Sequence, residues 1–136
     1  MTEHLVDTAV FAYALGGPHP QQKHCRTLVH RASAGEVALH ASVELVQEIL
    51  HHRMRRTDRP TAIRQARDVS ELCTLHAFGQ PVLRGALDLV ATTTLRGRDA
   101  VHAATALEHG LVTIISPDPD FDGAPGLTRI EPAALS

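Results

Sequence analysis

Three aspartates follow one apolar run near the end of the chain, with a single residue between each pair. The run covers residues 111–115 (LVTII), is rich in β-branched residues and is bounded by glycine and proline, which predicts a short buried strand. Asp118, Asp120 and Asp122 come shortly after it. Because clustered carboxylates repel one another, solvent, arginine partners or a metal ion must offset their charge. The pattern therefore predicts a polar site at the carboxyl end of this strand.

Further acids stand where other predicted elements begin or end. Asp7 follows a short apolar pair and Asp99 opens a helical pattern, and each has an ordinary explanation as a helix cap or a complement to a helix dipole. Glu44 and Glu48 share the polar face of another predicted helix, and periodicity alone singles out neither of them. Taken together, acids at the ends of parallel strands would meet at one edge of a sheet. Four or five carboxylates there would suit Mg²⁺ or Mn²⁺, which prefer oxygen ligands.

Short apolar segments alternate with helical patterns along the whole chain. The apolar segments show no two-faced alternation, which is typical of a parallel sheet covered on both sides. We therefore expect an α/β fold in which residues 1–136 form a single domain, with a short, mainly parallel central sheet flanked by helices. The predicted strands are 5–6, 36–41, 111–115 and 127–130, and the predicted helices are 9–15, 20–34, 43–54, 61–78, 82–95 and 99–110.

The composition argues against several classes of protein. The net charge is −2 and aromatic residues make up only 3% of the chain, so neither a polycationic surface nor base-stacking platforms should dominate nucleic-acid binding. Cys25 and Cys73 match no zinc or redox spacing. No segment has the character of a signal peptide or the length of a membrane span, so we expect a cytoplasmic protein that does not associate with a membrane.

Four stretches of the chain resemble those of one known family. They are LVDTAVFAYAL at 5–15, HASVELVQEIL at 40–50, GRDAVHAATALEHG at 97–110 and TIISPDPDFDGAPGL at 113–127. Their order is similar to that of PIN-domain ribonucleases, specifically the VapC-type toxins of bacterial toxin–antitoxin pairs. The resemblance spans nearly the whole chain and implies a PIN-like fold that hydrolyses RNA phosphodiesters to 5′-phosphate and 3′-hydroxyl ends. It also implies a Mg²⁺ cofactor (with Mn²⁺ as the alternative), a homodimer and a cognate VapB-like antitoxin.

The resemblance assigns five carboxylates to the catalytic site and selects one of the two helical glutamates. The metal ligands that it implies are Asp7, Asp99 and Asp118. The further ligands, or residues that position the attacking water, are Glu48 and Asp120. Two hydroxyl side chains match positions beside these acids and are candidates for substrate contacts, namely Thr8 and Ser116.

The densest basic segment, residues 51–56 (HHRMRR), follows Glu48 on the same predicted helix. Nearly all positive charge in the chain is arginine, because lysine occurs once, and the guanidinium group suits bidentate phosphate contacts. The segment is either an ordinary charged surface or a phosphate-binding patch. From their placement, we take Arg53, Arg55 and Arg56 as candidates for contacts with RNA.

Three other interpretations compete with a nuclease. The aspartates after residues 111–115 fit the first half of an EF-hand loop, but Arg129 occupies the position of its bidentate glutamate. A phosphoacceptor receiver domain would need a late lysine, whereas Lys23 is early in the chain. The sequence also fits a catalytically silent PIN-like module that binds RNA or protein. Metal-dependent cleavage that Asp7→Asn abolishes would separate the two.

Overall fold

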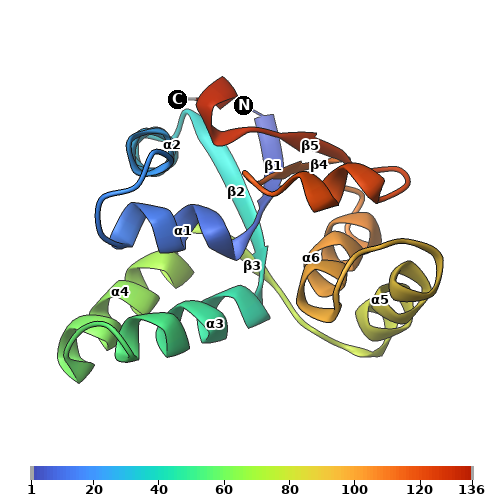
Figure 1. The fold of residues 1–136 in the computed structure, drawn as a ribbon, viewed down its shortest axis with the longest axis horizontal. Helices are drawn as coiled ribbons and strands as arrows, with labels where there is room; N and C mark the ends of the chain where they lie inside the picture. Colours follow the sequence, from blue (N-terminus) through green and yellow to red (C-terminus); the bar gives the residue numbers. More distant parts are fainter. Residues whose placement is uncertain (1, 136) are drawn as a thin grey trace.

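Five parallel strands form the central sheet in the computed structural model, which describes residues 2–135. The order across the sheet is β3–β2–β1–β4–β5, and every neighbouring pair is parallel. The first strand of the chain therefore lies in the middle of the sheet (Figure 1). The strands are β1 Thr2–Val6, β2 Val37–Ser42, β3 Thr74–His76, β4 Thr113–Ile115 and β5 Thr128–Ile130.

Six α-helices within the described residues cover the two faces of the sheet. Helices α1 to α4 lie on one side, and α5 and α6 lie on the other (Figure 1). None of these helices is long and apolar enough to cross a lipid bilayer. Their bounds are α1 Thr8–Leu15, α2 Gln22–Ser33, α3 Val43–Met54, α4 Arg59–Leu72, α5 Gln80–Thr92 and α6 Gly97–Glu108, and two short 3₁₀ helices cover Pro119–Gly123 and Pro132–Leu135.

The two middle strands send alternate side chains into two buried layers. Leu5 and Ile114 pack with the layer under α5 and α6, while Val6 and Ile115 pack with the layer under α1 to α4. All four side chains are fully buried. Because both faces are covered, these strands carry apolar residues at consecutive positions, as the sequence predicted. The packing fixes the carboxyl ends of β1 and β4 side by side.

Polar side chains cap the starts of α3 and α4, and a glycine turn follows α6. Ser42 Oγ accepts a hydrogen bond from the backbone N–H of Glu44 at 3.1 Å and so caps α3, which begins at residue 43 as the sequence predicted. Asp58 caps α4 by accepting from the N–H of Thr61 at 2.9 Å. After α6 the chain turns at Gly110, whose φ of 71° lies in a region that glycine adopts without strain. The turn sends the chain directly into β4.

The predicted α/β fold with a parallel sheet is confirmed, but one predicted element was wrong. The helix expected over residues 61–78 ends at Leu72, and the residues after it form β3. Cys73 is extended (φ −103°, ψ 149°) and buried, so the apolar spacing continues past the end of the helix. Since β3 is a three-residue edge strand with mostly exposed side chains, it offers little periodicity for recognition.

Candidate active site

The strand-end acids meet at the carboxyl edge of the sheet. Asp7 follows β1, Asp118 follows β4, and Asp99 lies in the first turn of α6. The N–H of Asp7 donates to the carbonyl of Ile115 at 3.0 Å, which joins the ends of the two strands. Carboxylate oxygens of Asp99, Asp118 and Asp120 all lie within 4.8 Å of one another. The spacing would allow one cation to contact oxygens from all three side chains.

Asp7 is held by a chain of hydrogen bonds rather than used as a helix cap. It stands at the N-cap position of α1, but its side chain makes no capping hydrogen bond. Instead, Ser116 Oγ donates to Asp7 Oδ2 at 2.8 Å, and the N–H of Asp118 donates to Ser116 Oγ at 3.0 Å. Ser116 is fully buried and Asp7 is only 5% exposed. The serine therefore fixes the two aspartates relative to each other and offers no accessible surface to a substrate.

The segment after β4 holds Asp118 and Asp120 in the acidic cluster and Asp122 in a separate ion pair. Asp118 Oδ1 accepts from the N–H of Asp120 at 2.9 Å and so caps the 3₁₀ helix Pro119–Gly123, which keeps both acids at the edge of the sheet. Asp122 points to Arg129, whose Nε lies 2.9 Å from its Oδ1. Asp122 is therefore paired outside the acidic cluster, and it is not among the five carboxylates that the resemblance assigned to the catalytic site.

Glu48 reaches the site from the opposite helical layer. It lies on α3, and its Oε2 accepts a hydrogen bond from Thr8 Oγ1 at 3.0 Å. Its Oε1 lies 3.3 Å from Nε2 of His102 on α6. The resemblance had selected Glu48 over Glu44, and the structure places Glu48 beside the acids. His102 was not among the predicted residues, although its position three residues after Asp99 on one helix was a usable signal.

The electrostatics of the cluster favour a cation. Burial, together with the nearby charges of Asp7 and Asp118, raises the pKa of Asp99 to about 6. Burial also raises the pKa of Asp7, against the opposing effect of His102. Burial alone would raise the pKa of Glu48, but the hydrogen bond and charge of His102 bring it below its ordinary value. The aspartates thus lack compensating charge, which a divalent ion bound by hard oxygen ligands would supply.

A basic cleft of about 400 Å³ opens next to Glu48. Residues of α1, of α6 and of the carboxyl-terminal end of α3 line it, and it adjoins the site at Glu48 and Thr8. Positive side chains beside a negative site would let a polyanion approach the acids despite their charge. The cationic or titratable side chains that line the cleft are His51, His52, Arg55, Arg56 and Arg98.

The arginines proposed from the sequence do not all face this cleft. Arg55 and Arg56 line it, whereas the Arg53 side chain is 7% exposed and donates from Nε to Oε1 of Gln65 at 2.9 Å. Arg53 therefore ties α3 to α4 inside the molecule, since the helix turns its side chain away from the other two. Arg98 takes its place at the cleft. It precedes Asp99 in the sequence, but a single arginine in a loop pattern carries no signal of its own.

The fold and this edge of the sheet together define an α/β protein with a candidate divalent-metal centre. The chain belongs to the PIN domain family, which it matches over residues 4–127. It is 32% identical over 133 residues to Ribonuclease VapC7 of Mycobacterium tuberculosis, covering 96% of this chain and 92% of that protein. It is also 32% identical over 131 residues to Ribonuclease VapC13 of the same organism, covering 93% and 98%. The family predicted from the sequence is confirmed.

Solved structures show the same fold at lower sequence identity. A toxin–antitoxin complex from Klebsiella pneumoniae contains a chain that is 19% identical, with a TM-score of 0.73 over 95% of this chain and 97% of that one. Mycobacterium tuberculosis VapC20, described as a sarcin–ricin loop cleaving toxin, is 16% identical, with a TM-score of 0.72 over 90% and 93%. These similarities concern the fold, and they agree with the family assignment.

Proposed function

We propose that the protein is a metal-dependent endoribonuclease that acts as the toxin of a toxin–antitoxin pair. The observation that carries the proposal is the cluster of Asp99, Asp118 and Asp120 beside the buried Asp7, at the carboxyl edge of a parallel sheet. The family membership supports it, because relatives that match nearly the full length of the chain are named VapC ribonucleases. RNA is the proposed substrate, cut to leave 5′-phosphate and 3′-hydroxyl ends.

The donor set fits a hard divalent cation, for which we propose Mg²⁺, with Mn²⁺ as a substitute. Asp7, Asp99 and Asp118 would hold it, and Asp120 would complete the site from its exposed position. Such an ion would make a bound water more acidic and neutralise charge that develops on the phosphate. Glu48, ionised because its pKa is lowered, would orient that water for in-line attack by accepting a hydrogen bond from it.

The basic cleft would hold the RNA strand next to the scissile phosphate. Arg55, Arg56 and Arg98 are placed to contact backbone phosphates, since they line the cavity that adjoins Glu48. Phosphate contacts give affinity that depends strongly on salt and little on base sequence. We leave Arg53 out of this set because its side chain is buried against Gln65, and Ser116 out because it has no accessible surface.

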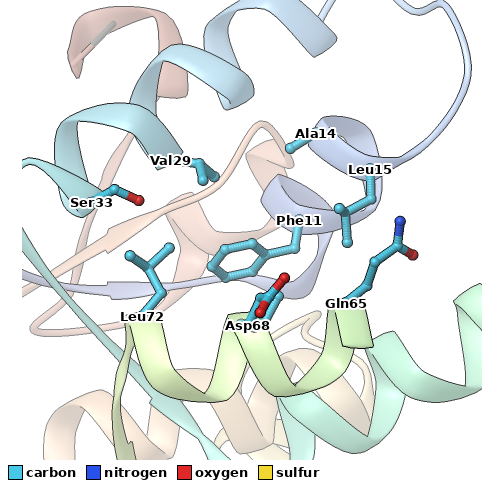
Figure 2. A pocket seen from close by; sticks show the side chains of 9 residues that line it. Phe11, Ala14, Leu15, Val29, Ser33, Gln65, Asp68 and Leu72 are labelled. Atoms are coloured by element: carbon cyan, nitrogen blue, oxygen red, sulfur yellow. The ribbon is translucent and has the colours of Figure 1, made fainter. Parts of the chain in front are cut away.

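We propose that a cognate VapB-like antitoxin docks on an apolar groove between α1, α2 and α4. The groove measures about 350 Å³, and Figure 2 shows the Phe11 ring on its floor between side chains of the three helices. Apolar side chains line most of it, and Asp68 and Gln65 provide polar groups at one side, which suits an amphipathic segment. The chain of similar fold from Klebsiella pneumoniae belongs to a toxin–antitoxin complex.

We further propose a homodimer in the cytoplasm. An apolar groove of about 200 Å³ between α3 and α4, lined by Val46, Leu50 and Ile63, offers a surface for a second copy. The cytoplasm is where an RNA-cleaving toxin would meet its substrate.

The proposed activity is tested by incubating the protein with total bacterial RNA and sequencing the new ends. Reactions contain Mg²⁺, Mn²⁺ or EDTA, and they compare wild type with Asp7→Asn/Asp99→Asn. The matched control is Asp68→Asn/Asp88→Asn, which removes two acids outside the site. We expect discrete metal-dependent cuts in wild type and control, and none in the site variant. Binding of RNA without cleavage under either metal would instead favour the catalytically silent module.

A further inference from the structure

His102 is a buried histidine inside the site that the proposed reaction does not yet use. Its side chain is 1% exposed, on a helix whose other buried residues are mostly alanines. Its Nε2 lies 3.1 Å from Thr8 Oγ1 and 3.3 Å from Glu48 Oε1. Its Nδ1 is buried and has no hydrogen-bond partner among the described residues. Within residues 2–135, the polar contacts of the ring are therefore directed at Glu48 and at the Thr8 hydroxyl that also binds Glu48.

The single hydroxyl hydrogen of Thr8 determines which group donates in the contacts of His102. The Thr8 hydroxyl has one hydrogen, and it donates that hydrogen to Glu48 Oε2 at 3.0 Å. Toward His102 the same oxygen can only accept, so Nε2 must carry a hydrogen. That N–H lies between Thr8 Oγ1 and Glu48 Oε1. Consequently each oxygen of the Glu48 carboxylate faces its own donor, one from α1 and one from α6.

Glu48 also has a competing partner close by. Arg98 lines both cavities that Glu48 lines, and its charge acts on the Glu48 carboxylate. A glutamate side chain has three rotatable bonds, so a direct pair with an arginine in the cleft is an available alternative. Such a pair would turn the carboxylate away from the acids and occupy a guanidinium that RNA would otherwise bind. A second fixed donor on the acid side opposes that change.

We propose that His102 is a positioning residue that holds the Glu48 carboxylate toward the acidic cluster by donating its Nε2–H to Oε1. The proposal rests on the proposed nuclease function, in which Glu48 orients the attacking water. His102 itself would touch neither RNA nor metal. Its effect would be on the rate of the chemical step, because a misplacement of about 1 Å in a catalytic group costs about 100-fold.

The test compares substitutions that keep or remove the donor. His102→Gln retains an N–H that reaches Glu48, whereas His102→Leu fills a similar volume without one. We expect the leucine variant to lose about 100-fold in kcat with KM and Mn²⁺ affinity unchanged within threefold, and the glutamine variant to retain most of kcat. The control is His4→Leu, which removes another buried histidine, whose ring bonds Thr113 rather than Glu48 or Thr8. Its kcat should match that of wild type.

A double-mutant cycle shows whether His102 acts through Glu48. In a Glu48→Gln background, His102→Leu should cause no further loss of kcat, because the group that it positions is already altered. The proposal is overturned if the two losses multiply, if folded His102→Leu cleaves at the wild-type rate, or if His102→Gln is as inactive as His102→Leu. Should the leucine variant fail to fold, His102→Asn serves instead, since its shorter side chain cannot bring a donor to Glu48.

A second readout does not need cleavage at all. The Glu48 carboxyl carbon is followed by NMR during a pH titration of wild type, His102→Gln and His102→Leu. Loss of the donor should raise the pKa of Glu48 in the leucine variant only. If wild type cleaves no RNA but this pattern is seen, the nuclease function fails while the contact stands. If the pKa of Glu48 is the same in all three proteins, the positioning role is refuted.

Discussion

Asp99→Asn should stabilise the metal-free protein while strongly reducing its stabilisation by Mg²⁺. Burial and the charges of Asp7 and Asp118 raise the pKa of Asp99 from 3.8 to about 6. A shift of about two pK units corresponds to about 3 kcal/mol of unfavourable free energy for the ionised form at pH 7.5. Asp99 is partly exposed, so solvent screening should reduce this to about 1–2 kcal/mol. For a chain of 136 residues the melting temperature should rise by about 4–8 °C.

The stabilising effect of Asp99→Asn should depend on pH. Because the folded-state pKa of Asp99 lies above the unfolded value, the folded protein binds the proton more tightly. The stability contributed by that proton is present below about pH 4 and is lost as the pH rises through about 6. The advantage of Asp99→Asn should therefore be largest at pH 7.5 and disappear near pH 4.

The assay is thermal unfolding followed by circular dichroism, with EDTA and with increasing Mg²⁺. At a cation concentration of ten times Kd, the wild type should gain about 1.4 kcal/mol, and Asp99→Asn should gain much less. Asp88→Asn, an exposed acid on α5, is the matched control and should behave as wild type in both conditions. The reasoning is refuted if Asp99→Asn melts at or below the wild-type temperature at pH 7.5, or if Mg²⁺ stabilises both proteins equally.

Other expected outcomes concern the metal, the RNA cleft and the core. Mn²⁺ affinity measured by calorimetry should be about tenfold weaker at pH 5 than at pH 7.5. The reason is that Asp99, with its pKa raised to about 6, must lose a proton to bind the cation. A Mn²⁺ affinity that does not change with pH would contradict this prediction. Arg55→Ala/Arg56→Ala should lower the salt slope of RNA binding by about 1.4, since each contact to a single strand contributes about 0.7, and an unchanged slope would exclude both from the interface. Arg53→Ala should leave that slope unchanged and instead lower the free energy of unfolding in urea by about 1–3 kcal/mol, because Gln65 loses its partner. Phe121→Ala, which truncates a fully buried ring, should cost about 3–5 kcal/mol in the same urea assay, and a loss below 1 kcal/mol would mean that the ring is not packed as described.

The parts of the fold that the sequence predicted are those with strong local patterns. Leu5 and Val6 before Asp7, and Ile114 and Ile115 before Asp118, are fully buried in the sheet, where burial on both faces demands consecutive apolar residues. The start of the helix at residue 43 was predictable because the cap that fixes it is an interaction between near neighbours, Ser42 and Glu44. β3 was missed because its pairing with β2 depends on residues more than 30 positions away, and nothing local marks the change from helix to strand after Leu72.

In the candidate site, too, some features were predictable from the sequence and others were not. Acids that end strands were predicted to meet, since parallel strands bring their carboxyl ends to one edge, and the structure brings Asp99, Asp118 and Asp120 together. Which direction each side chain takes was not predictable from placement alone. Arg53 turns inward to Gln65, and His102 turns toward Glu48, because these orientations depend on partners from other elements.

The most direct test of the central claim is anomalous X-ray diffraction from crystals soaked in Mn²⁺, recorded at the manganese edge. We expect one or two anomalous peaks at the carboxyl edge of the sheet, at about 2.2 Å from carboxylate oxygens of Asp99 and Asp118, with Asp7 or Asp120 completing the site. In Asp7→Asn/Asp99→Asn crystals treated in the same way, the peaks should be absent. Manganese bound elsewhere, or no peak at this edge in a wild-type crystal that leaves the acids accessible, would contradict a metal-dependent active site there.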